Sequence, residues 1–403
     1  MEDSPKGLSI RLILTLLIPI ILVLSVIYKA FEWSALKQMT VFASDATRQE
    51  ISMLYEQEQL EDRTSQLLDE THKDKDISHE QSIDKFDELL GIENLKKKNK
   101  EEYLKTLEIN KKKLDSIGSK KSLLLGKKRQ FLNSYYNSHS AYYQSQIELG
   151  KESNIRSSLM LNYLNNLKED AIMRDFFNRY EKKSNEELYA NFPELITLEK
   201  YTKADFKYID EEEIKISYPY GYETLIKYKN LFSSMYTVLK DYGTGNKDSA
   251  DYKTPKLYEA VTNISVDFDK FRNEYKDKAK SKTESALQNR IQTIMLAKKF
   301  NEEMLGKYPF LKTTSFQRED LALCYLYAVK TSYYKTISNN YPKAQGAKEL
   351  IDNLNELPPK TVDIDNKITA DAIGISINDK EIMFECKDAI DGKVFKFKIQ
   401  KAD

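Results

Sequence analysis

The chain is poor in the residues that form turns, metal sites and histidine-based active sites. Its 403 residues include only 12 glycines, 9 prolines and 3 histidines. So few glycines and prolines argue against a loop-rich β protein, whereas the abundant leucine, lysine and glutamate favour helices. We therefore predict a mainly α protein.

The only two cysteines, Cys324 and Cys386, stand 62 residues apart and match no zinc-binding or redox spacing. They could be paired outside a cell or free inside one. Free cysteine is among the most buried residue types, so we favour two separate buried thiols.

Several active-site motifs are missing from the sequence, namely the phosphate-binding glycine-rich loop, GxSxG and HExxH. We therefore predict no catalytic residue, no cofactor and no metal ligand. The spacing of His72, Asp76 and His79 would align them on one face of a helix, where they could hold a metal. Only the spacing supports such a site, and we prefer a solvated polar face. His139 lies beside a tyrosine-rich segment, and we expect its role to be structural.

Positive and negative charges balance in this chain, with 63 of each. A chain with zero net charge has no general electrostatic attraction to nucleic acid, so we predict no nucleic-acid partner. The 27 tyrosines would suit protein or glycan binding if they were exposed. In a sequence of this composition, we favour packing between helices as their main role.

One apolar run lies near the N-terminus. Residues 12–28 carry no charge, which is the short end of a membrane span, and Tyr28 and Trp33 supply interfacial aromatic side chains. The alternative is a cleaved signal peptide, but small residues do not closely follow the run. We therefore predict a short tail at 1–11 and a transmembrane anchor at 12–33, through which the protein contacts a lipid bilayer. A short tail before a large polar region favours an extracytoplasmic C-terminal bulk.

The segment after the anchor changes charge along its length. Residues 45–93 hold fifteen acidic and five basic side chains, whereas residues 95–129 hold thirteen basic and four acidic ones. Apolar residues recur at alternating spacings of three and four: Leu107, Leu114, Ile117, Leu124, Phe131, Tyr135, Tyr142 and Leu149. We predict a helical hairpin or coiled-coil stalk over 34–150, in which an acidic arm turns near Gly91 and pairs with a basic arm.

Such a stalk also predicts self-association, because its apolar seam needs a partner. The alternative is a basic arm bound to anionic lipid or nucleic acid, which requires the basic face to be free. A further alternative is plain disorder around residues 70–82.

The rest of the chain divides into a helical part and a β-rich end. Ser184 and Ser281 each begin a capping box ahead of an apolar run, so residues 151–357 are predicted to form a helical domain. Pro358-Pro359 makes a stiff boundary. Beyond it, alternating apolar residues and the turn signal Asp391-Gly392 predict a small antiparallel β module over 358–403.

The segment KYPF at 307–310, followed by a helix and a terminal β domain, resembles the outer-side region of the large membrane subunit of type VI secretion systems. The resemblance covers four residues and the order of the elements. The large cytoplasmic portion of that family has no counterpart in this sequence. No residue role is carried over from that family.

Because no motif identifies an activity, the functional prediction depends on the architecture. We predict a single-pass, membrane-anchored envelope protein with a non-enzymatic role in scaffolding or in binding other proteins, including as a subunit of a larger envelope or secretion assembly. The alternatives are an extracytoplasmic sensor or receptor, a cell-wall-acting enzyme with an unrecognised carboxylate site, and a cleaved, secreted protein.

Overall fold

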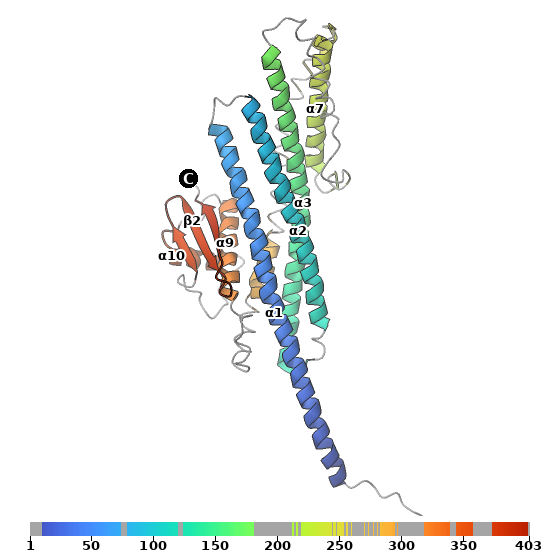
Figure 1. Cartoon of the computed structure of the whole chain (residues 1–403), viewed down its shortest axis with the longest axis vertical. Helices are drawn as coiled ribbons and strands as arrows, with labels where there is room; N and C mark the ends of the chain where they lie inside the picture. Colours follow the sequence, from blue (N-terminus) through green and yellow to red (C-terminus); the bar gives the residue numbers. More distant parts are fainter. Residues whose placement is uncertain are drawn as a thin grey trace, which may run out of the picture. The chain divides into compact units, whose positions relative to one another are not determined.

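The computed structural model describes residues 10–73, 79–119, 124–180, 219–243, 248–253, 283–294, 318–338, 344–357 and 373–401, together with scattered positions between 212 and 296. The described residues are mostly helical, with one small antiparallel sheet, as predicted (Figure 1). The chain divides into two compact units. The first comprises Met1–Ile51, Ile109–Tyr143 and Asn289–Asp403, and the second comprises Ser52–Glu108 and Gln144–Gln288.

Three long helices contribute residues to both units: α1 (Ile10–Lys73), α2 (His79–Gly118) and α3 (Gly126–Tyr180). A shorter helix, α7 (Pro219–Gly243), belongs to the second unit. The length of α1 has a simple local reason, since neither glycine nor proline occurs between Pro19 and the end of this helix.

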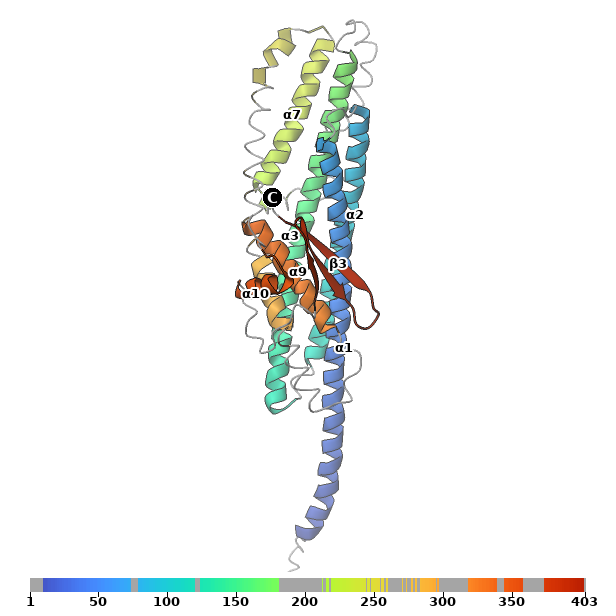
Figure 2. The ribbon, with the colours of Figure 1, turned by 90° about the vertical axis from the view of Figure 1, so that its left-hand side faces the viewer.

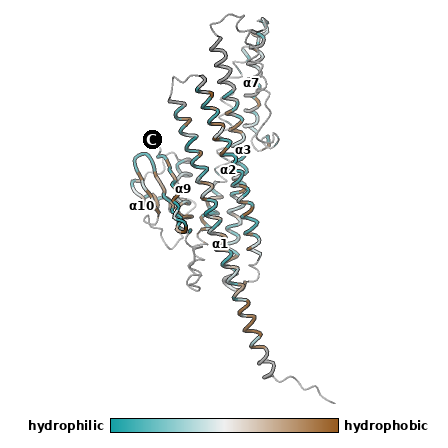
Figure 3. Tube along the Cα trace, in the orientation of Figure 1, coloured by the Kyte–Doolittle hydropathy of each residue, from teal (hydrophilic) through white to brown (hydrophobic). Residues whose placement is uncertain are grey.

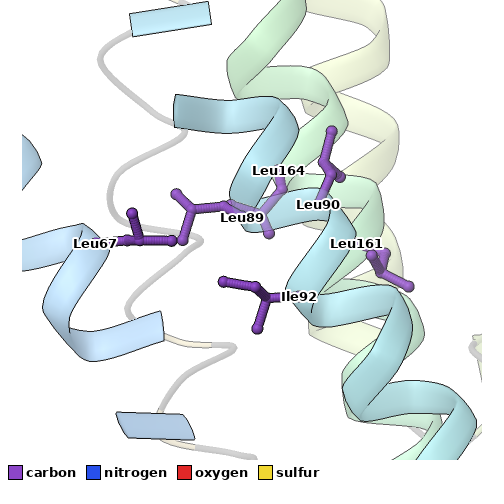
Figure 4. Close-up of a cluster of buried hydrophobic side chains, with 6 residues drawn as sticks. All are labelled: Leu67, Leu89, Leu90, Ile92, Leu161 and Leu164. Atoms are coloured by element: carbon purple, nitrogen blue, oxygen red, sulfur yellow. The ribbon is translucent and has the colours of Figure 1, made fainter. Parts of the chain in front are cut away.

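The core of the second unit is a cluster of aliphatic side chains from three helices (Figure 4). Leu67 of α1 and Leu89 of α2 point toward one another, and α3 contributes Leu161 and Leu164. Each such side chain stabilises the fold by about 2 kcal/mol when it leaves water. The cluster is flanked by ion pairs between helices, including Arg63–Glu88 at 2.7 Å.

The turn predicted near Gly91 is wrong, because Gly91 lies inside α2. Its neighbours on both sides, Leu90 and Ile92, are buried in the cluster just described. Glycine inside a helix costs roughly 1 kcal/mol relative to alanine, and burial of the adjacent aliphatic side chains outweighs that cost.

The apolar spacing predicted as one seam over residues 107–149 is divided between two helices. α2 ends at Gly118, and α3 begins at Gly126, whose φ of 64° suits glycine. A Cβ atom at Gly118 would lie 2.3 Å from the ring of Tyr136, so the glycine permits close packing of the two helix ends. Leu114 and Tyr135, one on each side of this break, are both buried, but a coiled-coil stalk with one continuous seam is not confirmed.

The predicted β module is present in the first unit. Strands β1 (Gly374–Ile377), β2 (Glu381–Lys387) and β3 (Val394–Gln400) form an antiparallel sheet in that order. The alternation of β3 is confirmed, because Phe395, Phe397 and Ile399 are at most 5% exposed. Gly392 has a φ of 73° in the turn between β2 and β3, as its turn signal predicted. Residues 358–372 of the predicted module lie outside the described residues.

Two helices complete this part of the first unit. Helix α9 (Glu319–Ser338) packs against β2 and β3, and α10 (Ala347–Glu356) packs against α9 and β1 (Figure 2). The buried Lys330 of α9 donates hydrogen bonds to the backbone carbonyls of Leu354 and Leu357 at the end of α10. A lysine in this position satisfies carbonyl groups that the helix itself leaves unpaired.

The interpretation of the cysteines as separate thiols is wrong. Cys324 of α9 and Cys386 of β2 form a disulfide with a Cα–Cα distance of 5.5 Å. The packing of α9 on the sheet brings the two side chains together. The spacing of the two cysteines in the sequence does not indicate this packing, so the sequence alone does not decide whether they pair.

Candidate functional site

The first part of α1 is apolar and exposed. The large apolar side chains between Leu17 and Ile27 are 44–68% exposed, and Figure 3 colours the start of α1 as a hydrophobic stretch of the trace. Within the described part of the chain, α1 is the helix that is long and apolar enough to cross a membrane, with a window of mean hydropathy 1.6 of which 6% is buried. A signal sequence has the same composition, so this property fits both an anchor and a signal.

Leu125, directly before α3, lies against the end of this apolar stretch. The backbone N–H of Leu125 donates a hydrogen bond of 3.0 Å to the hydroxyl of Tyr28. Leu125 itself is 69% exposed. The hydroxyl of Tyr136 on α3 donates to the carboxylate of Asp115 on α2 over 2.7 Å.

Beyond Tyr28, α1 and α2 enclose a groove of about 600 Å³. Its wall combines aromatic, aliphatic, amide, hydroxyl and charged side chains: Trp33, Ser34, Lys37, Gln38, Val41, Phe42, Asp45, Ala46, Gln49, Asn110, Lys113, Ser116 and Ile117. All of them belong to the first unit. The mixture suits an amphiphilic ligand better than a purely apolar one.

A buried ion pair lies further along α1, between Glu50 and Arg290. The Nη1 atom of Arg290 is 3.6 Å from Oε2 of Glu50, and both side chains are at most 7% exposed. The hydroxyl of Tyr142 donates a 2.8 Å hydrogen bond to the same oxygen. The guanidinium of Arg290 also lies 4.5 Å from the centroid of the Tyr142 ring, a favourable cation–π position.

His139 packs next to this pair in an aromatic environment. Its ring is stacked on Tyr143 at 5.0 Å and lies within 6.2 Å of Phe42, Tyr135 and Tyr142. Neither imidazole nitrogen has a hydrogen-bond partner within the described ranges. This environment agrees with the structural role expected for His139.

Burial controls protonation in this cluster. Desolvation, with a smaller contribution from Arg290, lowers the pKa of His139 from 6.5 to about 3, so the imidazole is neutral near pH 7. Desolvation raises the pKa of Tyr142 and of Tyr143 well above 10, and the charge of Glu50 raises both further. The imidazole and both tyrosines of this buried cluster are therefore uncharged near pH 7.

A second charged cluster fastens the β module to α1. The buried carboxylate of Asp388 forms an ion pair with Arg48 at 2.8 Å and accepts a 3.0 Å hydrogen bond from Arg318. Arg48 also contacts Asp391 at 2.9 Å, and its guanidinium lies 4.7 Å from the centroid of the Phe395 ring. Sequence reasoning missed this cluster, since its members come from three distant segments.

The two histidines considered as metal ligands do not lie on one helix. His72 belongs to α1 and His79 begins α2, whereas Asp76 lies outside the described residues. Among the residues that the structure describes, no group of three or more His, Cys, Asp or Glu side chains could hold a metal ion.

Comparison with known proteins gives no match, whether with family models, with curated proteins or with solved structures. The resemblance at residues 307–310 to a secretion-system subunit therefore gains no support, and these residues lie outside the described ranges.

Proposed function

We propose that this chain is a single-pass envelope protein, anchored by residues 12–33, that holds its C-terminal bulk outside the cytoplasm and acts there as a non-enzymatic scaffold for other proteins. The Cys324–Cys386 disulfide carries the proposal. Disulfides form and persist in oxidising compartments and are rare in the cytosol. The exposed apolar start of α1 supports anchoring on the same chain.

The scaffolding role is supported by the connection between the β module and α1. Arg48 lies twenty residues beyond Tyr28 on one continuous helix, which corresponds to roughly 30 Å of helix. The ion pairs at Asp388 and the disulfide hold the sheet at that position rather than on a free linker. A module fixed at a set distance from a membrane suits the presentation of a binding surface.

We further propose that the helical stalk of residues 34–150 self-associates. Leu68 on α1 and Leu95 on α2 are 40% and 51% exposed, and another copy of the chain could cover them. Sedimentation of the detergent-solubilised chain over a range of concentrations tests this. A chain that stays monomeric at every concentration would contradict self-association.

Topology is tested with a pair of C-terminal reporters, one active only outside and one active only inside the membrane, fused to the full chain. The intact N-terminal mass and the redox state of Cys324 and Cys386 are measured on the same protein. We expect an outside C-terminus, an uncleaved N-terminus and an oxidised pair. A chain that starts at residue 34 serves as the control and should leave only the inside reporter active.

The other outcomes are informative. An inside C-terminus with free thiols would contradict the proposal. A mature N-terminus beyond the apolar run would replace the anchored protein by a secreted one.

A further inference from the structure

The groove between α1 and α2 begins five residues beyond Tyr28, at Trp33. Trp33 is 40% exposed, and tryptophan is enriched where a span meets the polar surface of a bilayer. If residues 12–33 anchor the protein as proposed above, this end of the groove lies at the level of the lipid headgroups. The exposed Leu125, hydrogen-bonded to Tyr28, places the start of α3 near the same level.

The charged side chains near this end of the groove are suited to a phosphate. Lys37 lies on α1, one turn beyond Trp33, and its Nζ atom is 5.2 Å from the indole centroid. Lys113 enters the wall from α2 and has no ion pair within the described part of the chain. The one carboxylate in the wall, that of Asp45, is already bound by Arg318 at 3.2 Å.

Asn110 supplies an independent observation. Its side chain lines the groove and is 3% exposed, and its Nδ2 atom has no hydrogen-bond partner among the described residues. A buried amide donor without a partner is energetically unfavourable, so an acceptor from a ligand would relieve that penalty. Phosphate and ester oxygens of a lipid are such acceptors.

The remaining wall is apolar, with Val41, Phe42 and Ile117 among its members. A free phosphate ion would leave this surface uncovered, whereas the glycerol of a phosphatidylglycerol headgroup, which lies further from the bilayer than its phosphate, would cover part of it. We propose that the groove binds one anionic phospholipid of the surrounding bilayer, with Lys37 and Lys113 at its phosphate and Asn110 donating to a headgroup oxygen. The proposal rests on the membrane anchoring proposed above.

The chain has a single tryptophan, so its fluorescence reports on this groove directly. The full chain is placed in nanodiscs, one chain per disc, that contain phosphatidylglycerol and phosphatidylcholine. Either lipid carries bromine atoms on its upper acyl carbons, and bromine quenches tryptophan on contact. We expect brominated phosphatidylglycerol, as a minor component, to occupy the site with about tenfold preference over brominated phosphatidylcholine.

Two variants identify the residues responsible. Lys37→Gln with Lys113→Gln should reduce the preference to less than about twofold, since each lysine near an anionic surface contributes about fivefold in affinity. Lys105→Gln with Lys112→Gln is the matched control, because both lysines are exposed on α2 and neither lines the groove. Asn110→Leu should weaken the preference and leave the chain folded, because it removes the buried unpartnered amide.

Each other outcome overturns the proposal in a distinguishable way. Equal quenching by both lipids, or a preference that survives the double lysine substitution, would remove the lipid site and leave the anchor intact. No quenching by either lipid would place Trp33 away from the bilayer, so the anchoring itself would fail. A preference lost when two chains share one disc would identify a second copy of the chain as the occupant.

Discussion

The Nε atom of Arg48 lies 2.8 Å from a carboxylate oxygen of Asp388, whose side chain is fully buried. Arg48 belongs to the helix that begins as an apolar run, whereas Asp388 belongs to the turn between β2 and β3. Because Arg318 also contacts this oxygen, one buried carboxylate joins three separate segments of the first unit.

Replacing Arg48 by methionine should release the β module from α1. The substitution leaves the buried Asp388 with one cation in place of two, and loss of a buried partner costs about 3 kcal/mol. Amide hydrogen exchange in β2 and β3, measured on the detergent-solubilised chain, should accelerate accordingly. Lys396→Met is the control, since its 2.8 Å pair with Glu385 is half exposed and should change stability by less than about 0.5 kcal/mol. Equal effects of the two substitutions would contradict the role of Arg48.

The double substitution Cys324→Ala and Cys386→Ala should lower the free energy of unfolding by about 4 kcal/mol. The disulfide spans 62 residues, and its loss gives the unfolded chain more conformational freedom. Urea unfolding checks this value. A reducing agent should destabilise the wild-type chain by a similar amount and leave the variant unchanged. A reducing agent without effect on the wild type would mean that the cysteines are not paired.

Arg290→Met should destabilise the first unit by about 3–5 kcal/mol, because Glu50 would then be a buried charge without its cation. Replacing both Glu50 and Arg290 by methionine should cost less than the single change, since no uncompensated charge remains. Urea unfolding of the two variants and of Glu50→Met completes the cycle. Additive effects would show that the two side chains do not interact.

Features that depend on local pattern could be predicted from the sequence. The exposed apolar start of α1 follows from an uncharged run, and the sheet follows from a period of two around Phe395, Phe397 and Ile399. The turn at Gly392 could be predicted from the glycine itself, because a positive φ is energetically costly for other residues.

Features that depend on packing between distant segments could not be predicted. The turn expected at Gly91 assumed that a glycine ends a helix, but aliphatic neighbours on both sides keep it inside α2. The pairing of Cys324 with Cys386 depends on how α9 meets the sheet. Arg48 stands out in the sequence only as a basic residue in an acidic segment, which says nothing about Asp388.

His139→Phe should make the first unit less sensitive to acid. The pKa of His139 is lowered from 6.5 to about 3 on folding, so between these values the unfolded chain binds a proton that the folded chain does not. The free energy of unfolding therefore falls as the pH drops below 6.5, by up to about 1.4 kcal/mol per pH unit. Phenylalanine fits among the surrounding aromatic rings and cannot be protonated. Urea unfolding between pH 8 and pH 5 should show a shallower loss for the variant, and identical slopes would contradict the burial of a neutral imidazole.

Glu58→Gln, in the second unit, should change the pH dependence of the free energy of unfolding in the opposite direction. Desolvation, followed by the charges of Asp62 and Glu61, raises the pKa of Glu58 from 4.5 to about 8. Between these values the folded chain holds a proton that the unfolded chain has released, so the free energy of unfolding falls as the pH rises from 4.5 to 8. Glutamine keeps the shape of the protonated carboxyl and does not titrate.

The variant should therefore be more stable than the wild type at pH 8, by about 1–2 kcal/mol, and the difference should shrink toward pH 5. Urea unfolding at both pH values measures it. The control is Glu56→Gln, two residues away on α1 and exposed, which should leave the pH dependence unchanged. A stabilisation by Glu58→Gln that is equal at both pH values would mean that the gain does not come from deprotonation of this carboxyl.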